Sequence, residues 1–106
     1  MNNRLDQLLE MLREDENSSF LRFALAKEYE KMEDFDRALL CYEHIVQRDP
    51  DYAGVYYHYA GLLMEIEQYE RGFEVYDMGI ATCQKLGDHH ALAELKNART
   101  NWEFEL

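Results

Sequence analysis

The chain has 106 residues and carries 22 acidic and 11 basic side chains, which gives a formal net charge of −11. This length predicts one small domain, and so negative a field repels nucleic-acid phosphate and anionic membrane surfaces. Only two cysteines, Cys41 and Cys83, are present, without the close spacing of a disulfide or zinc framework. We therefore expect the protein to reside in a reducing compartment. No signal peptide or membrane-spanning stretch is visible, so we expect a cytoplasmic location, provided that residue 1 is the native start.

The first predicted element is an amphipathic helix over residues 3–14. Its leucines recur at helical spacing, at Leu5, Leu8, Leu9 and Leu12. An acidic and then serine-rich segment ends it, and a serine there is suited to accept a hydrogen bond from an early amide of the next helix.

Two helices are predicted over residues 20–32 and 35–47. Asp34 lies in the short turn between them and is the expected N-cap of the second. Pro50 ends this pair, because proline disfavours helical geometry in the residue before it.

The next pair is predicted over residues 52–66 and 69–86, with the turn near Gln68. Gly87 is a good helix terminator, and Asp88 is the expected cap of a final amphipathic helix that ends near Trp102 and Phe104. No stretch alternates with a period of two, so strands are not expected and the fold class is all-α.

The two predicted hairpins match each other at a spacing of 34 residues. Ala26 corresponds to Ala60, Glu33 to Glu67, Arg37 to Arg71 and Tyr42 to Tyr76. A fixed period of this length is typical of stacked helical repeats. The opening helix falls in the register of a second repeat helix and would cover an otherwise bare apolar face.

Both copies resemble the tetratricopeptide repeat, whose pattern is W-x2-L-G-x2-Y, then A-x3-F, then P. The first copy matches this pattern at Leu25, Ala26, Tyr29, Ala38, Tyr42 and Pro50. The second copy matches it at Tyr56, Tyr59, Ala60, Leu63, Gly72 and Tyr76, with Gln84 in place of proline. The small residues of the pattern stand where two helices cross closely.

The resemblance implies a right-handed superhelical stack of antiparallel helix hairpins. Residues 1–106 would form a single domain, with repeats over 19–52 and 53–86 and capping helices over 3–14 and 88–104. It also implies a non-catalytic module that binds a protein or peptide in a concave groove lined by the first helix of each hairpin. An assembly factor or co-chaperone is one form of this role, and the negative charge favours basic flanks on the partner.

Carried over to this chain, the groove residues form a set of aromatic, small and polar side chains. They are Phe20, Phe23, Lys27, Tyr57, His58, Gly61 and Met64. Phe23 and Tyr57 are one period apart, so we expect them to be neighbours on the inner wall. Aromatic side chains are enriched in binding hot spots, although the same residues could instead be ordinary core.

Other functions are kept as alternatives. The terminal helices, with Trp102, Phe104 and Leu106, could mediate self-association into a homo-oligomer, and a small acidic chaperone for a secreted or membrane client is a subclass of the binding role. An enzyme is the least favoured class. His89 and His90 point in different directions on a helix, and the Cys41/His44 pair lacks an oxyanion site. No cofactor and no metal are expected.

Overall fold

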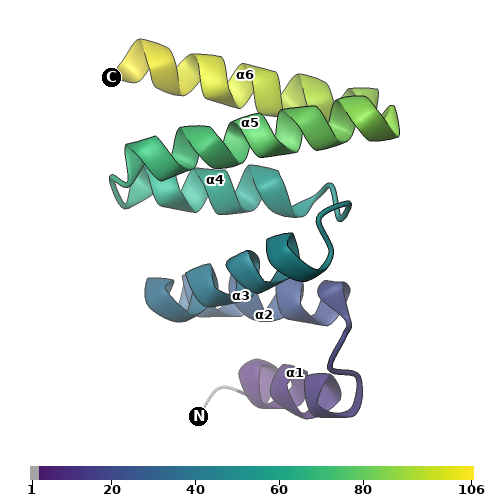
Figure 1. Cartoon of the computed structure of the whole chain (residues 1–106). Helices are drawn as coiled ribbons and strands as arrows, with labels where there is room; N and C mark the ends of the chain where they lie inside the picture. The colour runs from purple at the N-terminus through teal and green to yellow at the C-terminus, as the bar shows by residue number, and fades with distance from the viewer. Residues whose placement is uncertain (1–2) are drawn as a thin grey trace. The chain divides into compact units, whose positions relative to one another are not determined.

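The computed structural model describes residues 3–106, and 82% of these residues are helical. Six helices and no strand are present in this described part (Figure 1). They are α1 (Asn3–Glu14), α2 (Ser19–Lys31), α3 (Phe35–Arg48), α4 (Val55–Glu65), α5 (Tyr69–Leu86) and α6 (His89–Glu105). The predicted all-α class is confirmed. None of these helices is both long enough and apolar enough to cross a membrane.

Local hydrogen bonds set the helix ends. Ser18 accepts a bond from the Leu21 amide at 3.1 Å, and Asp34 and Asp88 accept from the amides three residues on. Each cap satisfies an amide that has no partner within its helix. Gly87 ends α5 in the left-handed conformation, with φ of 71°. The predicted caps and the predicted terminator are therefore confirmed.

One helix starts later than its sequence pattern predicts. The apolar spacing predicts a start at residue 52, but α4 begins at Val55. The segment before it instead forms a turn in which the Tyr56 hydroxyl donates to the carbonyl oxygen of Pro50. Tyr56 is buried, and this bond satisfies its hydroxyl.

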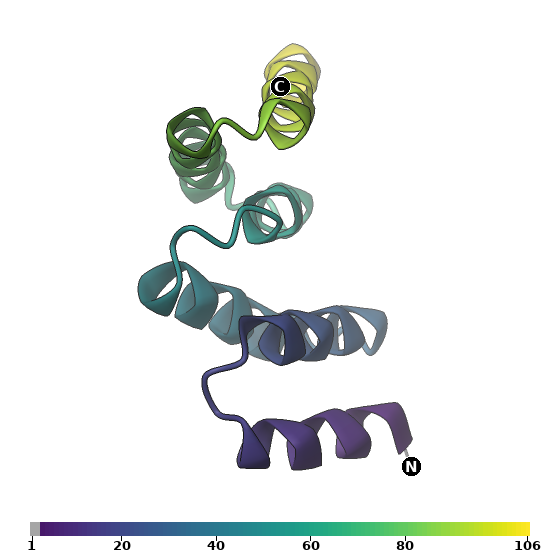
Figure 2. The same ribbon diagram turned by 90° about the vertical axis from the view of Figure 1, so that its right-hand side faces the viewer.

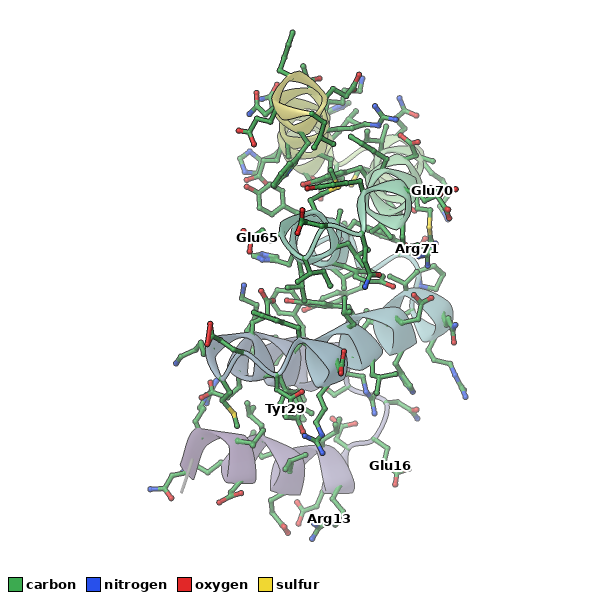
Figure 3. All side chains as sticks on the ribbon, turned by 90° about the vertical axis from the view of Figure 1, so that its left-hand side faces the viewer. Arg13, Glu16, Tyr29, Glu65, Glu70 and Arg71 are labelled. Atoms are coloured by element: carbon green, nitrogen blue, oxygen red, sulfur yellow. The ribbon has the colours of Figure 1, made fainter. Side chains whose placement is uncertain are left out.

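The chain divides into two compact units, one ending at Asp49 and the other comprising Pro50–Leu106. In the first unit α2 packs against both α1 and α3. Leu8 of α1 meets Leu21 and Leu25 of α2 in a buried cluster. Tyr29 extends this cluster, and Figure 3 shows it between α1 and α2. The opening helix therefore covers an apolar face of α2.

In the second unit α5 packs against α4 and α6, which also contact each other. Figure 2 shows these helices nearly end-on, with α5 on one side and α4 and α6 on the other. Arg99 joins α6 to α5, because its Nε lies 2.7 Å from Asp77 and its guanidinium stacks 5.0 Å from the Phe73 ring centroid. This triangular arrangement places exposed residues of α4 and α6 on the same side.

The small residues of the repeat lie at close helix crossings, as the pattern predicts. Ala26, Ala38 and Ala60 are fully buried. A Cβ added to Gly72 would lie 2.3 Å from the Met64 sulfur and 3.5 Å from the Ala60 carbonyl oxygen. Larger side chains at these positions would push paired helices apart.

The turn inside each hairpin places a glutamate in the left-handed region, with φ of 59° at Glu33 and 65° at Glu67. These positions are one period apart, so the two copies use the same turn. A Cβ makes this conformation unfavourable, and glycine adopts it without that penalty.

We therefore expect Glu33→Gly to be more stable than Glu33→Ala by about 1 kcal/mol. Both changes remove the same charge, so the difference isolates the backbone effect. Urea unfolding of the two variants, followed by circular dichroism, measures it. Equal stabilities would contradict the assigned turn.

Candidate partner-binding site

A cavity of about 240 Å³ opens in the second unit where α4 and α6 face the same side. Its lining combines aromatic, small and polar side chains. They are Tyr57, Gly61 and Glu65 of α4, Tyr76 of α5, and Ala98, Asn101 and Trp102 of α6.

The α4 side of the cavity is a single helix face. Tyr57, Gly61 and Glu65 follow at intervals of four residues, so they lie one above the other. Tyr57 is 44% exposed, and a Cβ added at Gly61 would meet no atom within 4 Å. Figure 3 shows Glu65 on the opposite side of the α4–α5 pair from Glu70. Along the helix, this face therefore presents the Tyr57 ring, the accessible backbone of Gly61 and the Glu65 carboxylate.

The α6 side adds an indole and an amide. Trp102 is half-buried and Asn101 is exposed one position before it. The Trp102 indole N–H donates a hydrogen bond to the Tyr76 hydroxyl at the base of the cavity. Burial raises the pKa of Tyr76 to about 12, with smaller contributions from nearby Tyr57 and Glu65. Tyr76 is thus a neutral, fixed group at neutral pH.

This arrangement of side chains suits the binding of a protein segment. Tyrosine and tryptophan present large rigid surfaces at low entropic cost, while Asn101 and Glu65 supply a donor, acceptors and a negative charge. A peptide or helix with an apolar side chain and a neighbouring cation matches these groups.

Only some of the predicted site residues of the second unit line the cavity. Tyr57 and Gly61 line the cavity. His58 is half-buried with its ring centroid 5.4 Å from that of Tyr57 in an edge-on arrangement, and it lies beside the cavity lining. The expectation that Met64 is exposed is wrong, because its side chain is only 1% exposed and fills the space above Gly72.

The predicted residues of the first unit are all on α2. Phe20 is 69% exposed. Phe23 is half-buried, with its ring centroid 6.1 Å from that of buried Tyr42, and Lys27 is half-buried with its Nζ 3.7 Å from a Glu30 carboxylate oxygen. Phe23 therefore combines the core and surface roles considered for it. Phe23 and Tyr57 belong to different units, so their expected neighbourhood stays a prediction.

Five lining residues were not among the predicted site residues: Glu65, Tyr76, Ala98, Asn101 and Trp102. Part of the lining could be inferred from positions in the sequence. Glu65 lies four residues after Gly61 on one helix face, and α6 falls in the register of a first helix of a further hairpin. At the 34-residue period Ala98 corresponds to Met64, whereas Asn101 and Trp102 correspond to Glu67 and Gln68 of the turn, so the repeat register indicates Ala98 but neither Asn101 nor Trp102.

The Cys41 thiol, one of the polar groups considered for chemistry, is partly buried. Burial raises the pKa of the Cys41 thiol to about 11, which disfavours the thiolate that a nucleophile needs. Among residues 3–106 no group of three or more histidine, cysteine, aspartate or glutamate side chains is arranged to hold a metal ion.

Comparison with known proteins identifies the family. No protein-family model matches the sequence, and no curated protein matches it significantly. A crystal structure of a tetratricopeptide repeat domain protein from Salinibacter ruber is 34% identical, with a TM-score of 0.76, covering 82% of this chain and 97% of that one. A solution structure of such a protein from the same organism gives 34% identity and a TM-score of 0.79, covering 82% of this chain and 88% of that one. The solution structure of a Bordetella parapertussis protein is 26% identical, with a TM-score of 0.83, covering 99% of this chain and 91% of that one. The chain therefore belongs to the tetratricopeptide repeat proteins, whose usual role is to bind other proteins.

Proposed function

We propose that this chain is a non-catalytic interaction module that holds a peptide or partner helix in the cavity between α4 and α6. The partner would contact Tyr57, Gly61 and Trp102 there. Phe20, Phe23 and Lys27 of the first unit form a further contact surface for the same partner or a second segment of it.

The observation that carries the proposal is the composition of the 240 Å³ cavity. An exposed tyrosine and a tryptophan flank a glycine whose backbone is open to approach. Binding hot spots are enriched in these two aromatic residues, and such cavities between helices are common ligand sites.

The charge of the site favours a basic partner. Glu65 lies at one end of the cavity, and the chain as a whole carries a net charge of −11. A lysine or arginine beside the apolar anchor of the partner would pair with Glu65, and the surrounding field would raise its association rate.

The test is affinity capture from the native cell extract, followed by mass spectrometry and by affinity measurement with the captured partner. We expect Tyr57→Ala to weaken binding by about 2 kcal/mol, or about 30-fold in Kd. Gly61→Phe should weaken it similarly, because the new ring would occupy the open space of the cavity. Circular dichroism of each variant checks that the helices are retained.

Phe104→Ala is the matched control, since Phe104 is an aromatic residue of α6 that is 86% exposed and outside the cavity lining. It should leave binding unchanged. Loss of the partner with Phe104→Ala, together with retention by folded Tyr57→Ala and Gly61→Phe, would reject the cavity and favour the terminal residues of α6.

A further inference from the structure

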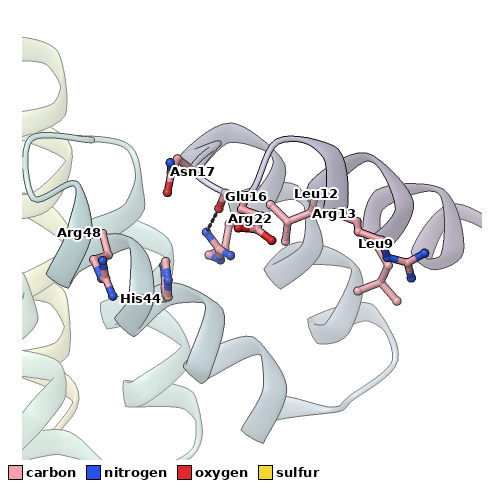
Figure 4. A pocket seen from close by; sticks show the side chains of 8 residues that line it. All are labelled: Leu9, Leu12, Arg13, Glu16, Asn17, Arg22, His44 and Arg48. Carbon is pink, nitrogen blue, oxygen red and sulfur yellow. Dashed lines mark hydrogen bonds between the residues drawn. The ribbon is translucent and has the colours of Figure 1, made fainter.

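A different hollow lies in the first unit, where the segment after α1 meets the start of α2 and the end of α3 (Figure 4). Its volume is about 560 Å³. The lining is unusually basic for so acidic a chain and consists of Leu9, Leu12, Arg13, Glu16, Asn17, Arg22, His44 and Arg48. A smaller hollow of about 250 Å³ shares Asn17, Arg22, His44 and Arg48 and adds Ser19, Ile45 and Asp49.

Three cationic or ionisable groups converge on this hollow from two helices. His44 and Arg48 are one turn apart on α3, and Figure 4 shows them close together. Arg22 comes from α2, and its Nη1 donates to the Glu16 backbone carbonyl at 2.9 Å. That bond orients the guanidinium while using one of its five N–H donors.

The start of α2 adds to the positive potential. Its first turn contains no acidic residue, so no carboxylate of that turn offsets the partial positive charge of the helix N-terminus. Ser19 and Asn17, at or before this turn, also line the smaller hollow and carry hydrogen-bonding side chains.

The carboxylates at the hollow are fewer than the cations. Asp49 accepts the Ser19 hydroxyl at 2.6 Å, and Glu16 is exposed. Arg13 also lines the hollow, and its guanidinium is paired at 3.0 Å with Glu10, which is not a lining residue. Burial and the nearby Arg22 and Arg48 lower the pKa of His44, so the imidazole lies in the field of both guanidiniums.

We propose that this hollow is an anion site for a phosphoryl group, held by Arg22 and Arg48 with His44 as a further donor. Guanidinium groups bind phosphate through paired N–H donors. The hollow is larger than a phosphate needs, and Leu9 and Leu12 line it as well. A phosphomonoester with a carbon portion against these leucines therefore fits better than free phosphate.

The test is a titration of the ¹⁵N-labelled chain with phenyl phosphate, inorganic phosphate and benzoate, each at ionic strength held constant with sodium chloride. Phenyl phosphate should shift amides confined to the segments 16–22 and 44–49. Inorganic phosphate should bind the same segments more weakly, and benzoate should bind least. If inorganic phosphate binds as tightly as phenyl phosphate, the preference for a phosphomonoester is wrong, whereas the assignment of a phosphoryl site holds.

Two variants address the basic residues. Arg22→Gln and Arg48→Gln should each weaken phenyl phosphate binding about tenfold or more, as expected for a lost charge-assisted hydrogen bond. Arg48 is exposed, so its variant keeps the test valid if loss of the Arg22 bond perturbs folding. Arg4→Gln, an exposed arginine of α1 outside the hollow, is the matched control and should bind as the parent does.

The histidine gives an independent readout. A bound dianion offsets the potentials of Arg22 and Arg48, so the pKa of His44 should rise on saturation. The charged groups around this hollow are Arg13, Glu16, Arg22, Arg48 and Asp49, and the Arg22 and Arg48 variants separate the contributions of the two guanidiniums. Shifts spread over the whole surface, equal effects of Arg4→Gln and Arg48→Gln, or benzoate binding equal to that of phenyl phosphate would overturn the proposal.

Discussion

Gly79→Ala is expected to lower the free energy of unfolding of the second unit by about 2 kcal/mol. Gly79 is buried in α5, where an added Cβ would lie 2.5 Å from Cβ and 2.9 Å from Cγ of Tyr56. It would also lie 3.0 Å from Leu95 Cδ1 of α6. The Cβ of Tyr56 is fixed to its backbone and cannot rotate away, so α4 and α5 must separate.

The expected sign runs against helix propensity. Alanine is favoured over glycine inside a helix by about 1 kcal/mol. Overpacking costs about 1–3 kcal/mol, and the two contacts below 3 Å place Gly79 at the upper end of that range. Packing therefore outweighs propensity at this position.

Gly61→Ala is the matched control, because the same substitution is made inside a helix of the same unit where no atom lies within 4 Å of the new Cβ. It should stabilise the unit by up to about 1 kcal/mol. Urea unfolding followed by the fluorescence of Trp102, the single tryptophan of the chain, measures both variants in the second unit. Stabilisation by Gly79→Ala would show that α4, α5 and α6 do not approach this closely.

The second unit is also expected to lose stability at high pH because of Tyr76. An unfolded tyrosine has a pKa near 10, whereas burial raises the pKa of Tyr76 to about 12. The unfolded chain therefore releases this proton first. The stabilisation is fully present below pH ~10 and is lost as the pH rises to about 12, which amounts to about 2–3 kcal/mol.

The measurement is the urea midpoint from Trp102 fluorescence between pH 9 and pH 12, compared with that of Tyr76→Phe. The variant should lose less stability over this interval, while at neutral pH it lacks the hydrogen bond from the Trp102 indole. Burial also raises the pKa of Tyr56, so the variant should still lose some stability. Parallel curves for the two proteins would show that Tyr76 ionises alike in the folded and unfolded states.

The sequence was sufficient for the helices and for most of their ends. The leucine spacing of α1, the caps Ser18, Asp34 and Asp88, and the terminator Gly87 depend on interactions within a few residues, so local patterns predict them. The start of α4 differs from the prediction, because the residues just before Val55 form a turn that the apolar spacing does not indicate.

The candidate site was predicted only in part, because exposure depends on packing between helices. Tyr57 and Gly61 line the cavity, yet Met64, which lies one helical turn after Gly61, is buried. The difference arises at Gly72, which leaves a space on α5 that only the Met64 side chain fills. A 34-residue period places Met64 opposite Glu30, and this correspondence gives no indication of its burial.

Gly79 illustrates the same limit of the repeat pattern. Its counterpart one period earlier is Ile45, a buried residue of α3. Glycine replaces that large side chain where α5 must accommodate both Tyr56 and Leu95. The two copies therefore differ at this position, where α6 packs against the second hairpin.

The order of packing partners has a consequence for the rate of folding. Within the described part of each unit, every helix packs against the helix next to it along the chain, and α4 and α6 also meet across an intervening element. Such low contact order demands little loop-closure entropy before native contacts form. Helical proteins with such local contacts typically fold on the microsecond to millisecond scale.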